Sequence, residues 1–156
     1  SAFVQMAARA GARVTGVCSA ANADLVTGLG AEEVIDYTRQ DFAAGGARFD
    51  VLIDTVGTAP WIRARKALVP GGRMLLVAGN ASDMLFGALK ARRDGKRLIA
   101  GVAGEAVEVL RAVVDMAAEG QFRPGIDRSY PFSEIEAAHR HVDSGHKRGS
   151  VGVRLV

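Results

Sequence analysis

The chain has 156 residues, 49% of them apolar and 24% charged, which is the composition of a globular domain with a core of its own. Its 20 basic and 17 acidic residues leave a net charge of only +3, and it carries no nucleic-acid recognition motif, so we expect no nucleic-acid partner. No uninterrupted apolar run reaches the roughly 18 residues of a membrane span and no signal peptide is recognisable, so we expect no membrane association. The chain has a single cysteine, Cys18, which is typical of proteins in the reducing cytoplasm.

Apolar runs of strand length alternate with amphipathic stretches of helix length over the first 120 residues. Strands are predicted at residues 13–18, 33–37, 50–57, 73–79 and 96–103, and helices at residues 2–10, 21–29, 59–69 and 104–120. Apolar strands that alternate with helices indicate a parallel sheet covered on both faces. The sequence therefore predicts an α/β fold with a doubly wound parallel sheet, the architecture of Rossmann-like nucleotide-binding domains.

Proline and glycine mark several boundaries of these elements. Pro60 stands near the first turn of its helix, where its missing N–H costs nothing, and Gly30 ends the preceding helix. The triplet at residues 70–72, Pro-Gly-Gly, predicts a turn between a helix and the next strand.

The pattern changes at residue 121. An extended connector is followed by a helix that begins at the capping-box pair Ser133 and Glu136 and ends at Gly145, and residues 150–156 alternate in the manner of a strand. We therefore divide the chain into a nucleotide-binding domain at residues 1–120 and a return segment at residues 121–156, which belongs with a second structural unit.

Ser19 follows the predicted strand at residues 13–18, where a dinucleotide-binding fold meets the adenosine ribose. An acidic residue there accepts hydrogen bonds from both ribose hydroxyls and repels a 2′-phosphate. Ser19 can instead donate to a phosphate oxygen, and Asn22 could add a second donor. Ser19 could equally cap the helix that begins near Ala20, and the two roles are compatible, since a helix N-terminus also favours an anion. We expect NADPH rather than NADH.

Other features that suggest catalysis or metal binding have simpler explanations. His139 and His141 are two positions apart on a helix, where side chains point about 200° apart, so the sequence predicts no metal site. Asp54 ends an apolar strand before a glycine turn, which favours a turn-forming role over a general acid. Gly101 and Gly104 lack the full dinucleotide-binding pattern and are interpreted as a turn. The basic residues at 90–97 are interpreted as a solvated loop.

The stretch CSAANADLVTGLGAEEVIDY at residues 18–37 resembles the medium-chain dehydrogenase/reductase superfamily, in its quinone-oxidoreductase-like and zinc-type alcohol dehydrogenase-like branch. The resemblance continues, in the family's order, through FDVLIDTVG, LVPGGRMLLVAGN, FRPGIDRSYPFSEIEAAHRHVDSGHKRG and SVGVRLV. It implies a reductase that uses a nicotinamide cofactor on quinones, enones or other carbonyl compounds. It also implies that this chain begins after the family's catalytic half, first Rossmann strand and glycine-rich turn.

The resemblance assigns cofactor contacts to residues that follow the strands and to a loop near the C-terminus. It places Ser19 against the 2′-phosphate of NADPH and Tyr37 beside that phosphate and the adenosine. Thr55 lies under the cofactor and Gly79 near the nicotinamide ribose. A C-terminal loop closes on the cofactor, and its residues are His146, Lys147 and Arg148. Relatives often carry a basic residue just after the serine, where this chain has Ala20 and Ala21.

No residue of this chain is assigned a catalytic role, so we expect the chain by itself to be inactive. The resemblance implies a homodimer formed through the strand at residues 96–103. The place of the missing first strand, between the strands at residues 13–18 and 50–56, would be filled by residues 150–156 or by a strand of another chain. A methyltransferase is a rival interpretation, which Ser19 in place of an acid disfavours. A non-catalytic nucleotide-binding or dimerisation module is the other alternative.

Overall fold

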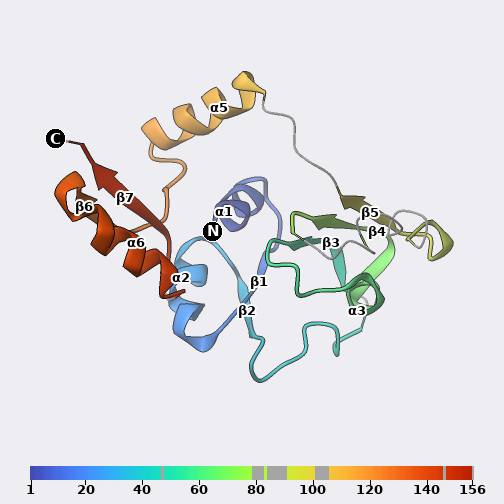
Figure 1. The fold of residues 1–156 in the computed structure, drawn as a ribbon. Coiled ribbons are helices and arrows are strands. Elements are labelled where there is room, and N and C mark those ends of the chain that lie inside the picture. The colour runs from blue at the N-terminus through green and yellow to red at the C-terminus, as the bar shows by residue number, and fades with distance from the viewer. Residues whose placement is uncertain (47, 79–82, 84–90, 101–105, 146, 156) are drawn as a thin grey trace. The chain divides into compact units, whose positions relative to one another are not determined.

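The computed structural model describes the whole chain except residues 47, 79–82, 84–90, 101–105, 146 and 156. The chain forms two compact units, one made of residues 1–38 and 105–156 and the other of residues 39–104 (Figure 1). The described strands form three sheets, β1-β2, β3-β4-β5 and β6-β7, and every pairing in them is parallel. The predicted α/β class, with parallel strands connected through helices, is confirmed. The assignment of residues 121–156 to a segment that packs on a catalytic domain stays a prediction.

The β1-β2 sheet in the first unit is a compact strand–helix–strand unit. Strand β1 (Thr15–Cys18) leads through a 3-10 helix (Ala20–Asn22) into helix α2 (Ala23–Gly28) and then into strand β2 (Glu33–Asp36). A Cβ at Gly16 would overlap Cγ1 of Val26, so α2 approaches β1 too closely for any larger residue. Gly30 turns the chain into β2 with a φ of 107°, a conformation that glycine adopts most readily.

Helix α1 (Ala2–Arg9) opens the chain, as predicted, and is attached to the segment before strand β6. The side-chain amide of Gln5 donates to the carbonyl of Arg123 at 3.0 Å and accepts from the N–H of Arg123 at 2.9 Å. Helix α5 (Val107–Ala118) belongs to the same unit.

A second strand–helix–strand unit lies at the C-terminal end of the chain. Strand β6 (Ile126–Pro131) is followed by helix α6 (Ile135–Asp143) and strand β7 (Ser150–Arg154), which returns parallel to β6. Tyr130 and Ala138 are buried where α6 covers the pair. Strand β7 therefore pairs with its near neighbour in sequence. Of the two candidates for the place beside β1, residues 150–156 are wrong, and a strand of another chain stays a prediction. A short α-helical crossover makes this pairing local and lowers the entropy of loop closure.

The predicted capping box at the start of α6 is also wrong. Ser133 lies inside a 3-10 helix (Phe132–Glu134), Glu134 takes the N-cap position of α6, and no side-chain cap hydrogen bond forms at either helix. The extra tight turn moves Ser133 away from the position that a capping serine needs.

The second unit is a three-stranded sheet with a helix on one face (Figure 1). Strand β3 (Phe49–Asp54), helix α3 (Trp61–Ala67), strand β4 (Leu68–Leu76) and strand β5 (Arg97–Ala100) follow one another. The core of this unit consists of Trp61, Ala64, Leu68, Met74, Leu76, Ala91 and Leu98. The predicted turn at residues 70–72 lies inside β4, because the strand begins directly after α3 and bends at Gly71, whose φ is 77°.

Candidate functional site

The carboxyl ends of β1 and β2 meet at one edge of the first unit. Cys18 and Asp36 are register partners at the last position of each strand, and the N–H of Tyr37 donates to the carbonyl of Cys18 at 3.2 Å. Ser19 and Tyr37 therefore follow neighbouring strands directly, and the Tyr37 side chain is 62% exposed. Nucleotides bind at this edge of open parallel sheets, so the two residues lie where a ribose phosphate would be expected.

Ser19 occupies the N-cap position of the 3-10 helix but does not cap it with its side chain. Its carbonyl accepts the N–H of Asn22 at 2.9 Å, and its hydroxyl makes no cap hydrogen bond. The alternative in which Ser19 serves as a helix cap is therefore wrong for the side chain. The half-buried hydroxyl keeps its donor for another group.

Arg148 brings a cation to this edge from the other end of the chain. Its Nε donates to Oδ1 of Asn22 at 3.0 Å, and its Nη2 donates to the carbonyl of Ala21. The guanidinium is thus held against the turn that contains Ala20 and Ala21. Relatives often carry a basic residue at these positions, and here Arg148 supplies the positive charge. The edge carries a hydroxyl from Ser19 and a positive charge from Arg148, both of them hydrogen-bond donors to an anion.

The remaining predicted cofactor contacts are not brought to this edge by described residues. Lys147 is exposed, and its Nζ donates to the carbonyl of Gly149 at 3.4 Å within its own loop. Thr55 is exposed directly after β3, in the second unit. Gly79 and His146 lie outside the described residues, as do Gly101 and Gly104. The cofactor roles of these residues stay predictions.

A carboxylate holds the loop that carries Arg148, and sequence reasoning missed it. Oδ2 of Asp127 in β6 lies 2.6 Å from Nε2 of His141 in α6, and the backbone N–H of Arg148 also hydrogen-bonds to Asp127. No local pattern connects a strand residue with a helix residue 14 positions later, so the packing of α6 on β6 is needed to find the pair.

Asp36 shapes the electrostatics of the same edge. Its Oδ1 accepts the N–H of Thr38 at 2.9 Å and the hydroxyl of Thr38 at 2.7 Å. Burial raises the pKa of the Cys18 thiol, and the neighbouring Asp36 carboxylate raises it further, because both disfavour the thiolate. Cys18 is therefore a neutral thiol at pH 7.

Cys18 is expected to react slowly with iodoacetamide near neutral pH. The pKa of Cys18 in the folded protein lies above the ordinary value of about 8.5. The protonated thiol therefore contributes fully to the stability of the fold below about pH 8.5, and this contribution is lost as the pH rises through the folded pKa. The rate of alkylation against pH measures this, and the chain has no other cysteine. The midpoint should be higher in the folded than in the urea-unfolded protein, and Asp36→Asn should lower it in part. An equal midpoint in both states would contradict the prediction.

Asp54 organises the turn after β3, as predicted. The side chain is 6% exposed and accepts the backbone N–H groups of Val56 at 3.0 Å, Gly57 at 2.8 Å and Ala59 at 2.9 Å. These bonds occupy both carboxylate oxygens, which supports a turn-forming role over a general acid.

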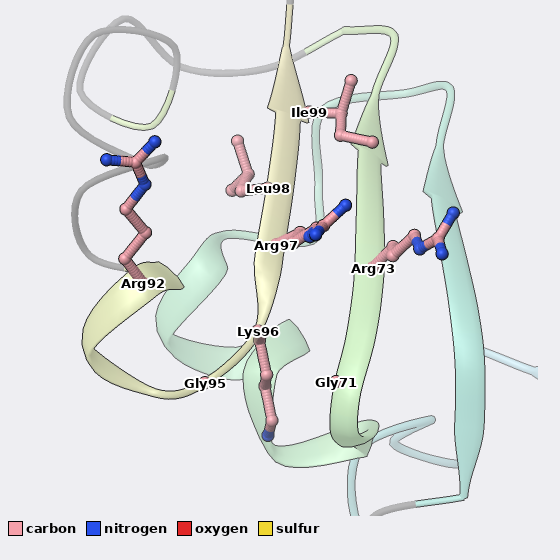
Figure 2. Close-up of a pocket in the computed structure, with 8 residues that line it drawn as sticks. All are labelled: Gly71, Arg73, Arg92, Gly95, Lys96, Arg97, Leu98 and Ile99. Carbon is pink, nitrogen blue, oxygen red and sulfur yellow. The ribbon is translucent and has the colours of Figure 1, made fainter.

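A basic depression of about 720 Å³ lies in the second unit, along β4 and β5 (Figure 2). Arg73 and Arg97 are register partners and point to one side, whereas Arg92 extends on the other side of β5 (Figure 2). Lys96 donates to the backbone carbonyl of Arg65. The basic side chains do not converge on one centre, and the depression is not the candidate site.

Among the residues that the structure describes, no group of three His, Cys, Asp or Glu side chains lies close enough to hold a metal ion. None of the described helices has the length and apolar character needed to cross a membrane.

Known proteins resemble this chain over most of its length. It is 31% identical over 155 residues to the chloroplastic quinone-oxidoreductase QR1 of Triphysaria versicolor. The alignment covers 96% of this chain and 47% of that protein. It is 33% identical over 171 residues to the mitochondrial NAD(P)H oxidoreductase RTN4IP1 of Mus musculus, covering 94% and 42%. The chain thus spans about half the length of the curated relatives that it matches.

Structural comparison gives the same fold. The quinone oxidoreductase from Coxiella burnetii superposes with a TM-score of 0.83 at 24% identity, over 99% of this chain and 49% of that one. The sequence profile of a family described as zinc-binding dehydrogenase matches residues 29–151. The family resemblance seen at residues 18–37 is therefore confirmed, and the chain belongs to the zinc-binding dehydrogenases of the medium-chain dehydrogenase/reductase superfamily.

Proposed function

We propose that the whole protein is an NADPH-dependent oxidoreductase of quinones, enones or related carbonyl compounds, and that this chain is its cofactor-binding portion. The observation that carries the proposal is the position of the Arg148 guanidinium, which hydrogen-bonds to Asn22 and Ala21 in the turn that begins at Ser19, after strand β1. Relatives named as quinone, NAD(P)H and alkenal/one oxidoreductases support the reaction class.

The chemistry of this edge favours a 2′-phosphate over a free ribose. Residue 19 supplies a neutral hydroxyl in the position where an acid would bind the ribose hydroxyls of NADH. Arg148 supplies a guanidinium that forms charge-assisted hydrogen bonds with phosphate. The nearby carboxylate of Asp36 ends β2 rather than β1, and Thr38 hydrogen-bonds to it twice. Tyr37, exposed beside Ser19, offers a ring and a hydroxyl to the adenosine.

The nicotinamide supplies the hydride when the cofactor is bound, and the residues of this chain bind and orient it. No described residue is proposed as a proton donor, and the substrate contacts are assigned to other parts of the whole protein. We infer that the 156 residues alone bind the cofactor without transferring hydride. Among the described residues, no three His, Cys, Asp or Glu side chains form a group that could hold the zinc ion in the family's description, so none of these residues is assigned to zinc.

Two simpler features support a proposal for assembly and one for location. Among the described residues, strand β5 pairs on one side only, with β4, and we propose that a second copy pairs with its other side to form a homodimer. The single cysteine supports a reducing compartment such as the cytoplasm.

Arg148→Ala in the whole protein is expected to weaken NADPH binding about 10- to 100-fold, because a charged hydrogen bond contributes about 1.5–3 kcal/mol. The dissociation constant of NADH should change less than about twofold, since NADH lacks the 2′-phosphate. Titration of cofactor fluorescence measures both constants. Arg140→Ala is the matched control, because it removes an exposed arginine of the same unit, on helix α6, that is assigned no cofactor contact. A parent protein that binds NADH more tightly than NADPH would overturn the proposal.

A further inference from the structure

We propose that Asp127 and His141 are positioning residues that hold Arg148 in place for the 2′-phosphate, and so set the preference for NADPH without touching the cofactor. This inference rests on the proposed function. The pair lies between β6 and α6, and the Asp127 carboxylate accepts hydrogen bonds from two directions, from His141 at 2.6 Å and from the backbone N–H of Arg148.

The pair is better sheltered than the other ion pair on the same helix. The side chains of His141 and Asp127 are 22% and 21% exposed. Arg140 and Glu136, one turn apart on α6, are 72% and 86% exposed and meet at 3.5 Å. A short, sheltered hydrogen bond between ionisable groups fixes geometry far better than an exposed pair.

The chain just after Arg148 is fixed against the start of β6. A Cβ at Gly149 would overlap the carbonyl oxygen of Gly125, and the N–H of Ser150 donates to that same carbonyl at 2.6 Å. Arg148 is therefore held by its own N–H on Asp127 and by a tightly packed glycine that follows. From this fixed backbone its side chain reaches Ala21 and Asn22 beside Ser19.

The charges around Asp127 keep it ionised. The hydrogen bond from His141 holds the pKa of the Asp127 carboxyl below its usual range, against a smaller opposing effect of burial, and the Arg148 N–H and the charges of His141 and Arg128 add to the shift. Tyr130, whose ring lies 6.2 Å from that of His141, faces the pair from β6. A lowered pKa means that the carboxylate's contribution is present above about pH 4 and is lost only as the pH falls through the folded value.

A double-mutant cycle in the whole protein tests the inference. Asp127→Ala is expected to raise the dissociation constant of NADPH about 5- to 10-fold, to leave that of NADH within about twofold, and to have no further effect once Arg148 is already alanine. Glu136→Ala is the matched control, because it removes the exposed carboxylate of the same helix. Asp127→Asn, which keeps a side-chain acceptor for the Arg148 N–H, should restore most of the NADPH affinity.

The outcomes separate this inference from the proposed function. If Arg148→Ala leaves NADPH binding unchanged, the proposed function fails, and this inference fails with it. If Arg148→Ala weakens NADPH binding but Asp127→Ala either has no effect or adds its full effect in the double variant, only the positioning role is overturned. Should Asp127→Ala not fold, His141→Ala removes the other half of the pair and must shift NADPH affinity selectively, or the inference is wrong.

Discussion

Replacing Ser19 with aspartate is expected to reverse the cofactor preference of the whole protein from NADPH to NADH. The new carboxylate would repel the 2′-phosphate beside Arg148 and accept hydrogen bonds from the free ribose hydroxyls of NADH. With about 1.5–3 kcal/mol for each charged hydrogen bond, the ratio of kcat/KM for the two cofactors should change by about 10²–10³. Steady-state rates with each cofactor and one quinone substrate measure the ratio.

Two controls separate the position of the charge from the charge itself. Ser19→Ala removes the hydroxyl alone and should weaken NADPH several-fold without improving NADH. Thr27→Asp places a carboxylate on the exposed surface of α2 and should leave the ratio nearly unchanged. The prediction would be contradicted by a parent enzyme that already prefers NADH or by a Ser19→Asp variant that still prefers NADPH. Either result would show that the carboxyl edge of β1 and β2 does not distinguish NADPH from NADH through the 2′-phosphate.

Asp54→Ala is expected to lower the free energy of unfolding of the second unit by about 3–5 kcal/mol, because it leaves the N–H groups of Val56, Gly57 and Ala59 without their acceptor. Asp54→Asn keeps the oxygen that accepts two of these groups and should cost about 1–2 kcal/mol. Urea unfolding followed by tryptophan fluorescence measures both, since the only tryptophan, Trp61, is buried in this unit.

Asp50→Ala is the matched control for this stability measurement. Asp50 is exposed in the same strand, and its removal should change the unfolding free energy by less than about 0.5 kcal/mol. Equal effects of Asp54→Ala and Asp50→Ala would mean that the turn does not depend on the buried carboxylate.

The sequence alone was sufficient for the class of fold and for one side of the candidate site. Apolar runs separated by amphipathic stretches located β1, α2, β2 and β3 to within a few residues, because strand and helix periodicities are local properties of the chain. The position of Ser19 and Tyr37 followed from the same pattern, since parallel strands end at a common edge. The turn-forming role of Asp54 was local as well, because its carboxylate accepts the N–H groups of residues two, three and five positions later in the chain.

Only the tertiary structure decided which groups join Ser19 at that edge. Arg148 meets Asn22 across 126 residues of sequence, and Asp127 meets His141 only because α6 packs on β6. The failed capping box at Ser133 and the pairing of β7 with β6 have the same origin. Periodicity shows which face of an element is apolar, but the partner of a polar side chain depends on how distant elements pack, and no local pattern of residues encodes that packing.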